Sequence, residues 1–209
     1  DFVTRKQGFE KQTEDRVMVI GVDKAQQDGK HILKHKMLQD MGHQLIDLPI
    51  PVGDYIEITP EIKEVIDRRK DKLKKMDLIG LINVSVDTKR DCEELYSCLM
   101  QGHKRFSDSC FLAHNNGIQL VILVENMDGV TSVDNLEKWK NEKRWKSYFI
   151  ARKRAERIGT KVPKPPCKPS QLKQIMWTMH EKYGTEFVFC RPDETAQKIV
   201  EYLTSDNNK

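Results

Sequence analysis

The stretch LINVSVDTK, residues 81–89, decides the fold that we predict for this chain. Its apolar and β-branched residues are typical of a buried strand. The strand ends in Asp87 and Lys89, and residues two apart in an extended chain project to the same face. We therefore expect a carboxylate and an ammonium group side by side at the end of a central strand.

Further carboxylates are predicted at neighbouring strand ends. The segment PIPVGDY, residues 49–55, is a Pro/Gly turn that delivers Asp54 to the apolar stretch 55–58. Another apolar strand, residues 17–22, ends at Asp23. Ligands gather at the carboxyl ends of strands in open α/β sheets, and carboxylate oxygens suit Mg²⁺ and Mn²⁺. Asp54 and Asp87 are thus candidate metal ligands, with Lys89 placed to orient water or to steady charge on phosphorus.

Strands alternate with helices along the chain, which predicts an α/β fold with an at least partly parallel sheet. The predicted strands are residues 17–22, 45–48, 55–58, 77–89, 118–124 and 186–190, and the predicted helices are 31–41, 60–75, 92–100, 103–115, 142–158, 170–183 and 192–203. We expect residues 1–16 to be a flexible leader, 17–204 a single domain and 205–209 a tail.

The composition favours a soluble protein with a sizeable core, because 38% of the 209 residues are hydrophobic and 33% are charged. The five cysteines are scattered without a CxxC pair, which argues against zinc and for reduced thiols in a cytosol-like compartment. No apolar run reaches the length of a membrane span. The chain lacks a GxxxxGK[ST] loop, which disfavours a nucleoside triphosphatase.

A basic segment, residues 138–168, mixes lysine and arginine with aromatic residues. Between Lys138 and Lys173 the only acidic residues are Glu142 and Glu156, and this imbalance is typical of a surface that follows phosphates. The alternative is a solvated helix with Trp139 and Trp145 in the core, where we place these two side chains. The candidate nucleic-acid contacts in this segment are Arg144, Lys146, Arg152, Lys153 and Arg154.

Taken in order, these motifs resemble the GD…ERKxxxD pattern of XPF-type structure-specific endonucleases, which belong to the PD-(D/E)xK nuclease group. The matching pieces are VGDY (52–55), VSVDTK (84–89) and Glu93, with VIGVD (19–23) similar to the first strand and GHKRF (102–106) similar to the segment after the catalytic helix. The resemblance spans roughly residues 17–125. Residues 169–203 look like the closing part of short phage and bacterial single-domain members.

The resemblance implies a restriction-endonuclease-like mixed sheet flanked by helices and a Mg²⁺- or Mn²⁺-dependent endonuclease that cleaves branched or flapped DNA. It implies Asp54 and Asp87 as metal ligands, Lys89 as the group that orients water, Glu93 as a support for the metal or the lysine, and Asp23 as a further carboxylate of the metal site. It implies that Arg105 contacts DNA phosphate, and its neighbours His103 and Lys104 join it as candidates. It also implies a possible homodimer and a bacterial or phage-infected host cytoplasm.

The sequence departs from the family pattern in three places. Thr88 stands where the family has arginine, Glu93 replaces aspartate, and Ala25 and Gln26 replace an Arg-Glu pair. These departures keep a second hypothesis open, a nuclease-like DNA-binding module with weakened cleavage. A third hypothesis, a small phosphohydrolase acting on nucleotides, is disfavoured because a mononucleotide needs no basic stretch of this length.

Overall fold

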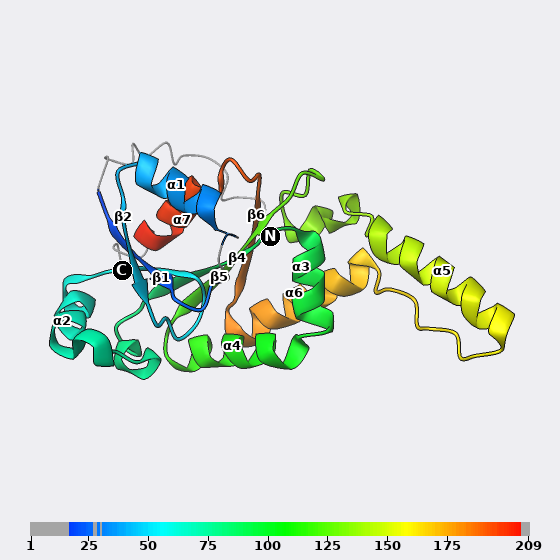
Figure 1. Ribbon diagram of the computed structural model, residues 1–209, viewed down its shortest axis with the longest axis horizontal. Coiled ribbons are helices and arrows are strands. Elements are labelled where there is room, and N and C mark those ends of the chain that lie inside the picture. The colour runs from blue at the N-terminus through cyan, green and yellow to red at the C-terminus, as the bar shows by residue number, and fades with distance from the viewer. Residues whose placement is uncertain (1–16, 27–28, 30, 206–209) are drawn as a thin grey trace.

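A six-stranded mixed sheet forms the centre of the molecule, with strand order β2-β1-β3-β4-β5-β6 (Figure 1). The computed structural model describes residues 17–26, 29 and 31–205. The strands are β1 (Val19–Asp23), β2 (Gln44–Leu48), β3 (Tyr55–Glu57), β4 (Val84–Lys89), β5 (Gln119–Glu125) and β6 (Glu186–Cys190). The pairs β1–β2, β4–β5 and β5–β6 are parallel, whereas β3 runs antiparallel to both β1 and β4. The predicted α/β class and the partly parallel sheet are therefore confirmed.

Helices cover both faces of this sheet. The helices are α1 (Ile32–Asp40), α2 (Pro60–Arg69), α3 (Cys92–Met100), α4 (His103–Asn115), α5 (Glu142–Ile158), α6 (Pro169–Tyr183) and α7 (Thr195–Thr204), with short 3-10 turns η1 (Lys70–Lys72), η2 (Lys75–Leu78) and η3 (Val133–Lys138). Helices α1 and α7 lie on one face, and α3, α4 and α6 lie on the other (Figure 1). Helix α5 projects from the body as an arm, and the chain returns along it to α6.

Alternation along the strands divides the apolar side chains between two cores. In β4, Val84 and Val86 pack with α1 and α7, and in β5 the residues Leu120 and Ile122 pack with α3, α4 and α6. Successive residues of a strand point to opposite faces, so the residues of β4 that follow, Asp87 to Lys89, are also divided between the two faces. This division positions the candidate site.

The central strand is shorter than its sequence suggests. It begins at Val84, and the preceding residues predicted as strand include the 3-10 turn η2. Helix α2 ends at Arg69, where Lys70 has a positive φ of 49°. The predicted leader 1–16 and residues 206–209 of the predicted tail lie outside the described part of the chain.

Helix α1 exposes two of its apolar side chains. Ile32 and Leu33 are 64% and 76% exposed. The buried residues of this helix are Lys34 and Leu38, four apart on one face. A buried lysine requires a charged or polar partner, and Lys34 pairs with Glu125 at the end of β5.

The five cysteines are all free thiols. Burial raises the pKa of Cys92 to about 12 and that of Cys190 to about 11, so these thiols stay protonated near neutral pH. Among the helices that the structure describes, none has the length and apolar character needed to cross a membrane.

Candidate active site

The turn before β3 packs closely against β4 and is hydrogen-bonded to it, and these contacts set the position of Asp54. Gly53 has a φ of +79°, and a Cβ built on it would lie 2.1 Å from Ser85 Oγ. The Ser85 hydroxyl donates a hydrogen bond of 2.6 Å to the carbonyl oxygen of Val52, and the Asp54 amide donates one of 2.8 Å to the carbonyl of Val86. Only glycine combines this backbone conformation with so close an approach.

The Asp54 carboxylate is held by the residue between Asp87 and Lys89. Its Oδ2 accepts hydrogen bonds from the backbone amide and from the hydroxyl of Thr88, both at 2.8 Å. Thr88 directly follows Asp87, and the charge of Asp54 acts on Asp87, so the two acids lie near each other at the end of β4. Threonine is present where the resembled family has arginine, and its hydroxyl provides one of these two bonds.

Asp87 and Lys89 form an ion pair on the α3 side of the sheet. Lys89 Nζ lies 2.5 Å from Asp87 Oδ1, and the lysine side chain is only 10% exposed. Burial raises the pKa of Asp87, and the neighbouring Asp54 carboxylate raises it further against the opposing effect of Lys89. Burial acting alone lowers the pKa of Lys89, but Asp87 and Asp54 together raise it to a value above its ordinary one. Lys89 therefore keeps its proton.

Asp23 does not join Asp54 and Asp87. Its backbone amide donates to the carbonyl of Asp54 at 2.9 Å, but its carboxylate accepts from the amide of Ile50 at 3.2 Å and lies 3.9 Å from Lys75 Nζ. Among the described residues, no three histidine, cysteine, aspartate or glutamate side chains are close enough to hold one ion. The predicted set of three carboxylates is therefore corrected to two.

Glu93 forms an ion pair with the arm, helix α5. Its carboxylate pairs with Arg144 Nε at 2.5 Å, and Arg144 also donates to Ser97 Oγ at 2.8 Å. The acid of α3 whose charge acts on Asp87 is Glu94. Glu93 thus holds the base of α5, and its predicted role beside the lysine or the metal stays a prediction.

A second acid–lysine pair lies on the other face of β4. Lys34 Nζ lies 3.1 Å from Glu125 Oε1 and donates a long hydrogen bond of 3.5 Å to Thr88 Oγ1. Glu125 also accepts a bond of 3.0 Å from the hydroxyl of Thr195. A continuous polar chain therefore runs from Glu125 through Lys34 and Thr88 to Asp54.

These polar contacts between Glu125, Lys34 and Thr88 are not predicted from the sequence, although one of the residues carried a recognisable signal. Glu125 ends a buried strand, which is the same criterion that selected Asp23 and Asp87. Lys34 had no comparable signal, because it lies within a helical pattern whose apolar residues suggested a different buried face. Thr88 was read only as a departure from the family arginine.

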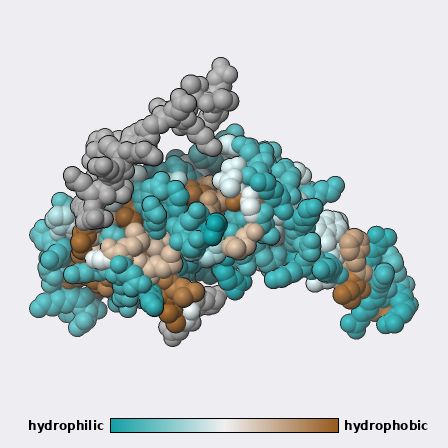
Figure 2. Space-filling model, turned by 90° about the horizontal axis from the view of Figure 1, so that it is seen from above, coloured by the Kyte–Doolittle hydropathy of each residue, from teal (hydrophilic) through white to brown (hydrophobic). Residues whose placement is uncertain are grey.

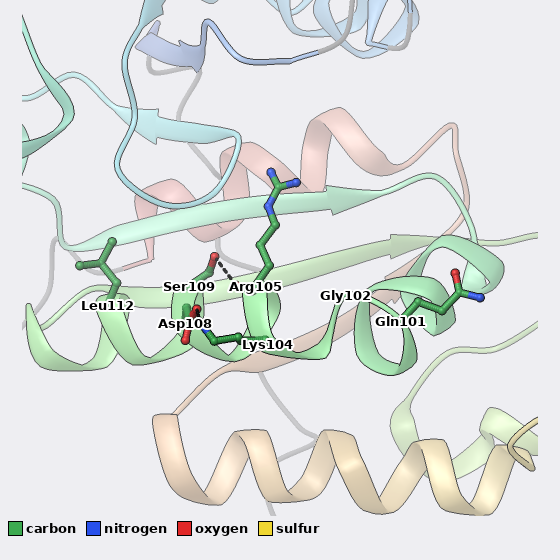
Figure 3. A pocket seen from close by; sticks show the side chains of 7 residues that line it. All are labelled: Gln101, Gly102, Lys104, Arg105, Asp108, Ser109 and Leu112. Carbon is green, nitrogen blue, oxygen red and sulfur yellow. Dashed lines mark hydrogen bonds and ion pairs between the residues drawn. The ribbon is translucent and has the colours of Figure 1, made fainter.

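Arg105 and its neighbour Lys104 differ in their surroundings. Figure 3 shows Arg105 reaching from α4 toward the strands, at a hollow of about 540 Å³. Burial raises the pKa of the Cys98 thiol, and the charges of Lys89 and Arg105 oppose that effect, so both cations lie near Cys98. Lys104 pairs with Asp108 at 3.5 Å. His103 is exposed, and its Nδ1 lies 3.1 Å from the carbonyl of Leu99.

The other basic candidates all lie on α5. Lys146 and Arg152 pair with acids one turn away, Glu142 and Glu156, at 3.6 and 2.8 Å. Lys153 and Arg154 are exposed. These cations therefore lie on the arm, in a different part of the chain from Asp54 and Asp87.

The two tryptophans at the base of the arm differ. Trp139 is 8% exposed and packs in the core, as predicted. Trp145 is only partly buried and contacts Tyr148 edge-on and Phe149 at a tilt, both in its own helix, with ring centroids 5.8 and 5.7 Å apart. The prediction that Trp145 lies in the core is wrong, because the arm leaves the body at this point.

Comparison with solved structures identifies a similar fold. The structure of XPF from Aeropyrum pernix matches with a TM-score of 0.51 at 14% sequence identity. The fold is XPF-like. The match covers 91% of this chain and 62% of that chain, so this chain spans less than two thirds of the XPF structure. The predicted restriction-endonuclease-like arrangement, a mixed sheet flanked by helices, is confirmed. Neither the protein-family models nor the curated protein sequences contain a match.

Proposed function

We propose that this chain is a Mg²⁺- or Mn²⁺-dependent endonuclease that cleaves branched or flapped DNA. The observation that carries the proposal is that Asp54 bonds Thr88 while its charge acts on Asp87, beside the buried ammonium of Lys89. Two acids and a lysine from two segments of the chain thus lie near one another at one strand end. The XPF-like fold supports the same conclusion.

The chemistry of these acids fits a hard divalent ion. Burial raises the pKa of Asp87, and repulsion from the Asp54 carboxylate raises it further, so a cation beside the two acids would relieve this repulsion. Mg²⁺ is commonly bound by one or two carboxylates together with water and substrate phosphates, so the pair Asp54 and Asp87 is sufficient. An ion held by this pair would polarise the scissile phosphate and lower the pKa of bound water.

Lys89 would act as a hydrogen-bond donor and a fixed positive charge. Its raised pKa argues against a role as general base, because the ammonium keeps its proton near neutral pH. A buried cation that already points at Asp87 can stabilise charge developing on a phosphate without reorganisation. Thr88 would hold Asp54 in place, and Arg105 would bind a phosphate next to the cleaved bond.

DNA binding would use the cations of α4 and the arm. Lys153 and Arg154 are exposed on α5, and lysine and arginine that neutralise phosphates supply most sequence-independent affinity for DNA. A homodimer is a further part of this proposal. Apolar side chains are exposed on the arm (Figure 2), among them Phe149 and Ile150 at 49% and 71% exposed. They are available for a contact between two copies, and light scattering tests whether such a dimer forms.

A DNA-binding module with weakened cleavage is the second candidate. It is favoured by Gln26, which stands in place of a family acid and whose amide lies 3.4 Å from the Asp54 carbonyl oxygen. It is also favoured by the absence of a third ligand among the described residues.

A cleavage assay separates the two candidates. Flapped and linear DNA are incubated with the protein in Mg²⁺, Mn²⁺ or EDTA, and the Asp87→Asn variant is compared with Asp40→Asn, which changes an exposed acid at the end of α1. We expect metal-dependent nicking by the unaltered protein and by Asp40→Asn and a loss of at least about 100-fold in Asp87→Asn. Tight DNA binding without products in either metal would support the module instead.

A further inference from the structure

The base of the arm and the body enclose a groove that the nuclease proposal does not use. It has a volume of about 970 Å³ and lies between α3, α4, α6 and the returning chain at residues 164–168, with Trp145 of α5 at one side. Volumes of this size are at the upper end for ligand sites.

The charge of the groove selects a polyanion. Its lining includes Lys164, Lys168, Lys182 and His103, all exposed, and none of its lining residues is acidic. The whole chain has nearly equal numbers of basic and acidic residues, 36 and 32, so a groove lined by basic residues without acidic ones differs from the chain's average composition. Phosphate oxygens would find several cations in it and no repelling carboxylate.

The groove also offers aromatic faces. Trp145 and Tyr183 line it, and both rings are partly exposed. The hydroxyl of Tyr183 is fixed by Ser107 Oγ at 3.2 Å, and Lys182 Nζ lies 5.0 Å from the centre of the ring. Aromatic rings next to cations are the elements that bind unpaired bases and their phosphates in single-stranded nucleic acid.

One wall of the groove is preorganised. The returning chain contains Pro163, Pro165 and Pro166, which restrict the backbone to extended conformations. The amide of Cys167 donates to the Tyr96 hydroxyl at 3.0 Å, which ties this wall to α3. Because this wall is already ordered, binding a ligand would cost little conformational entropy in this part of the protein.

Helix α3 links the groove to the strand that carries Asp87 and Lys89. An adjoining hollow of about 510 Å³ is lined by Glu93 and Arg144 and shares Tyr96, Lys164, Pro165 and Pro166 with the groove. Helix α3 connects the two regions, since Cys92 follows Lys89 closely and Met100 lies in the groove. Nine helical residues span about 13.5 Å, or roughly four base-pair steps at 3.4 Å each.

We propose that this groove binds a single-stranded DNA segment adjacent to the cleavage site. Lys164, Lys168 and Lys182 bind its phosphates, and unpaired bases stack on Trp145 and Tyr183. The inference rests on the proposed nuclease function and deepens it, because it assigns the part of a flapped substrate that the body of the protein holds. The duplex part stays outside the groove, near the exposed cations of the arm.

Binding of a labelled single-stranded oligothymidylate to the full chain in EDTA tests the proposal by fluorescence anisotropy. The groove variant K164Q/K168Q/K182Q is compared with K63Q/K72Q/K74Q, which removes three exposed lysines near α2. We expect the groove variant to bind at least about tenfold more weakly and its log Kd–log salt slope to fall by about 2, given 0.7 per phosphate for single strands. The control variant should retain the affinity of the unaltered protein.

Stacking is tested with Trp145→Ala and Trp145→Phe. Loss of one stacked base weakens single-strand binding by roughly tenfold, and phenylalanine should restore most of it. Melting curves of each variant establish that it is folded. Equal binding by the two lysine variants, or equal competition by duplex of the same length, overturns the proposal.

The outcomes separate this proposal from the nuclease itself. Binding in EDTA needs no cleavage, so groove-dependent binding by a protein that never cuts DNA supports the groove and refutes the nuclease. Metal-dependent cutting of flapped DNA that is unchanged in K164Q/K168Q/K182Q supports the nuclease and refutes the groove.

Discussion

Lys34 and Glu125 form an ion pair of 3.1 Å in the interior, with each side chain 9% exposed. The pair lies on the α1 side of β4, and Asp87 and Lys89 form a second pair on the α3 side of the same strand. The Thr88 hydroxyl contacts Lys34 of the first pair and also bonds Asp54. The end of β4 is thus flanked by an acid–lysine pair on each face.

Removing one partner of the inner pair should destabilise the fold strongly. In Lys34→Met, Glu125 keeps only Thr195 as its bonded partner among the contacts described above, and an uncompensated buried charge costs about 3–5 kcal/mol. Urea unfolding measures this loss. Adding Glu125→Gln removes the orphaned charge and should recover at least half of the lost stability. A double variant that is less stable than Lys34→Met would contradict this account.

The Thr88 hydroxyl should matter for stability and for cleavage. Thr88→Val keeps the shape and the backbone bond to Asp54 but removes the hydroxyl bond of 2.8 Å. A hydrogen bond to a charged group contributes about 1.5–3 kcal/mol, so kcat/KM for flapped DNA should fall by roughly 10- to 100-fold. Thr88→Ser restores the hydroxyl and should restore most of the activity. Serine and valine variants of equal activity would show that the bond is dispensable.

Gly53 should resist substitution more than a glycine with similar backbone angles. Both Gly53 and Gly80 have positive φ, +79° and +84°, but a Cβ meets Ser85 Oγ only at Gly53 and has nothing within 4 Å at Gly80. Gly80→Ala should cost about 1–2 kcal/mol for its conformation alone, and Gly53→Ala should cost more in urea unfolding. The double change G53A/S85A tests the clash, because it removes the hydroxyl that the new methyl group meets. Equal losses at the two glycines would exclude a role for the close approach.

Protonation of His43 should destabilise the protein in mild acid. His43 Nδ1 accepts a hydrogen bond of 3.2 Å from the Met18 amide, and burial lowers the pKa of His43 below 6.5. The unfolded chain then binds protons at a higher pH than the native one, so this stabilisation is complete above about pH 6.5 and is lost as pH falls toward the native pKa. Urea unfolding at pH 7.5, 6.5 and 5.5 should show the decline.

The variant His43→Asn provides the control for that pH dependence. Its side-chain oxygen can accept the same amide bond without titrating, so part of the decline should disappear. A remainder is expected from His35, whose pKa is also lowered by burial, with Lys34 acting in the same direction and Asp47 opposing. An unchanged pH profile in His43→Asn would refute the assignment to His43.

Local pattern was a sound guide where one element is governed by its own residues. The apolar run of β5 and the Thr59–Pro60 start of α2, whose Thr59 hydroxyl accepts from the amide of Ile62 at 3.4 Å, form as their sequences indicate. The turn at Gly53 also delivers Asp54 to the strand end where it was expected. Such features depend on steric preferences and hydrogen bonds within a few residues.

Local sequence patterns could not predict which side chains from distant segments would pair with each other. Glu93 has the spacing of a catalytic acid, yet the arm supplies Arg144 as its partner. Asp23 ends a strand as predicted, yet Lys75 and the Ile50 amide take its carboxylate. Strand position brings each acid to the correct edge of the sheet, but charge pairing across the fold decides where its oxygens point.

The sequence by itself determined the alternation of strands and helices, the turn that carries Asp54, and the adjacency of Asp87, Thr88 and Lys89 on one strand. Only the tertiary structure decided that Asp54 bonds Thr88, that Lys34 is buried against Glu125, and that α5 stands away from the body to leave a basic groove. The physical reason is range. Backbone preference and apolar periodicity act over one helical turn or one strand pleat, whereas a buried charge must find its counterion wherever packing places it.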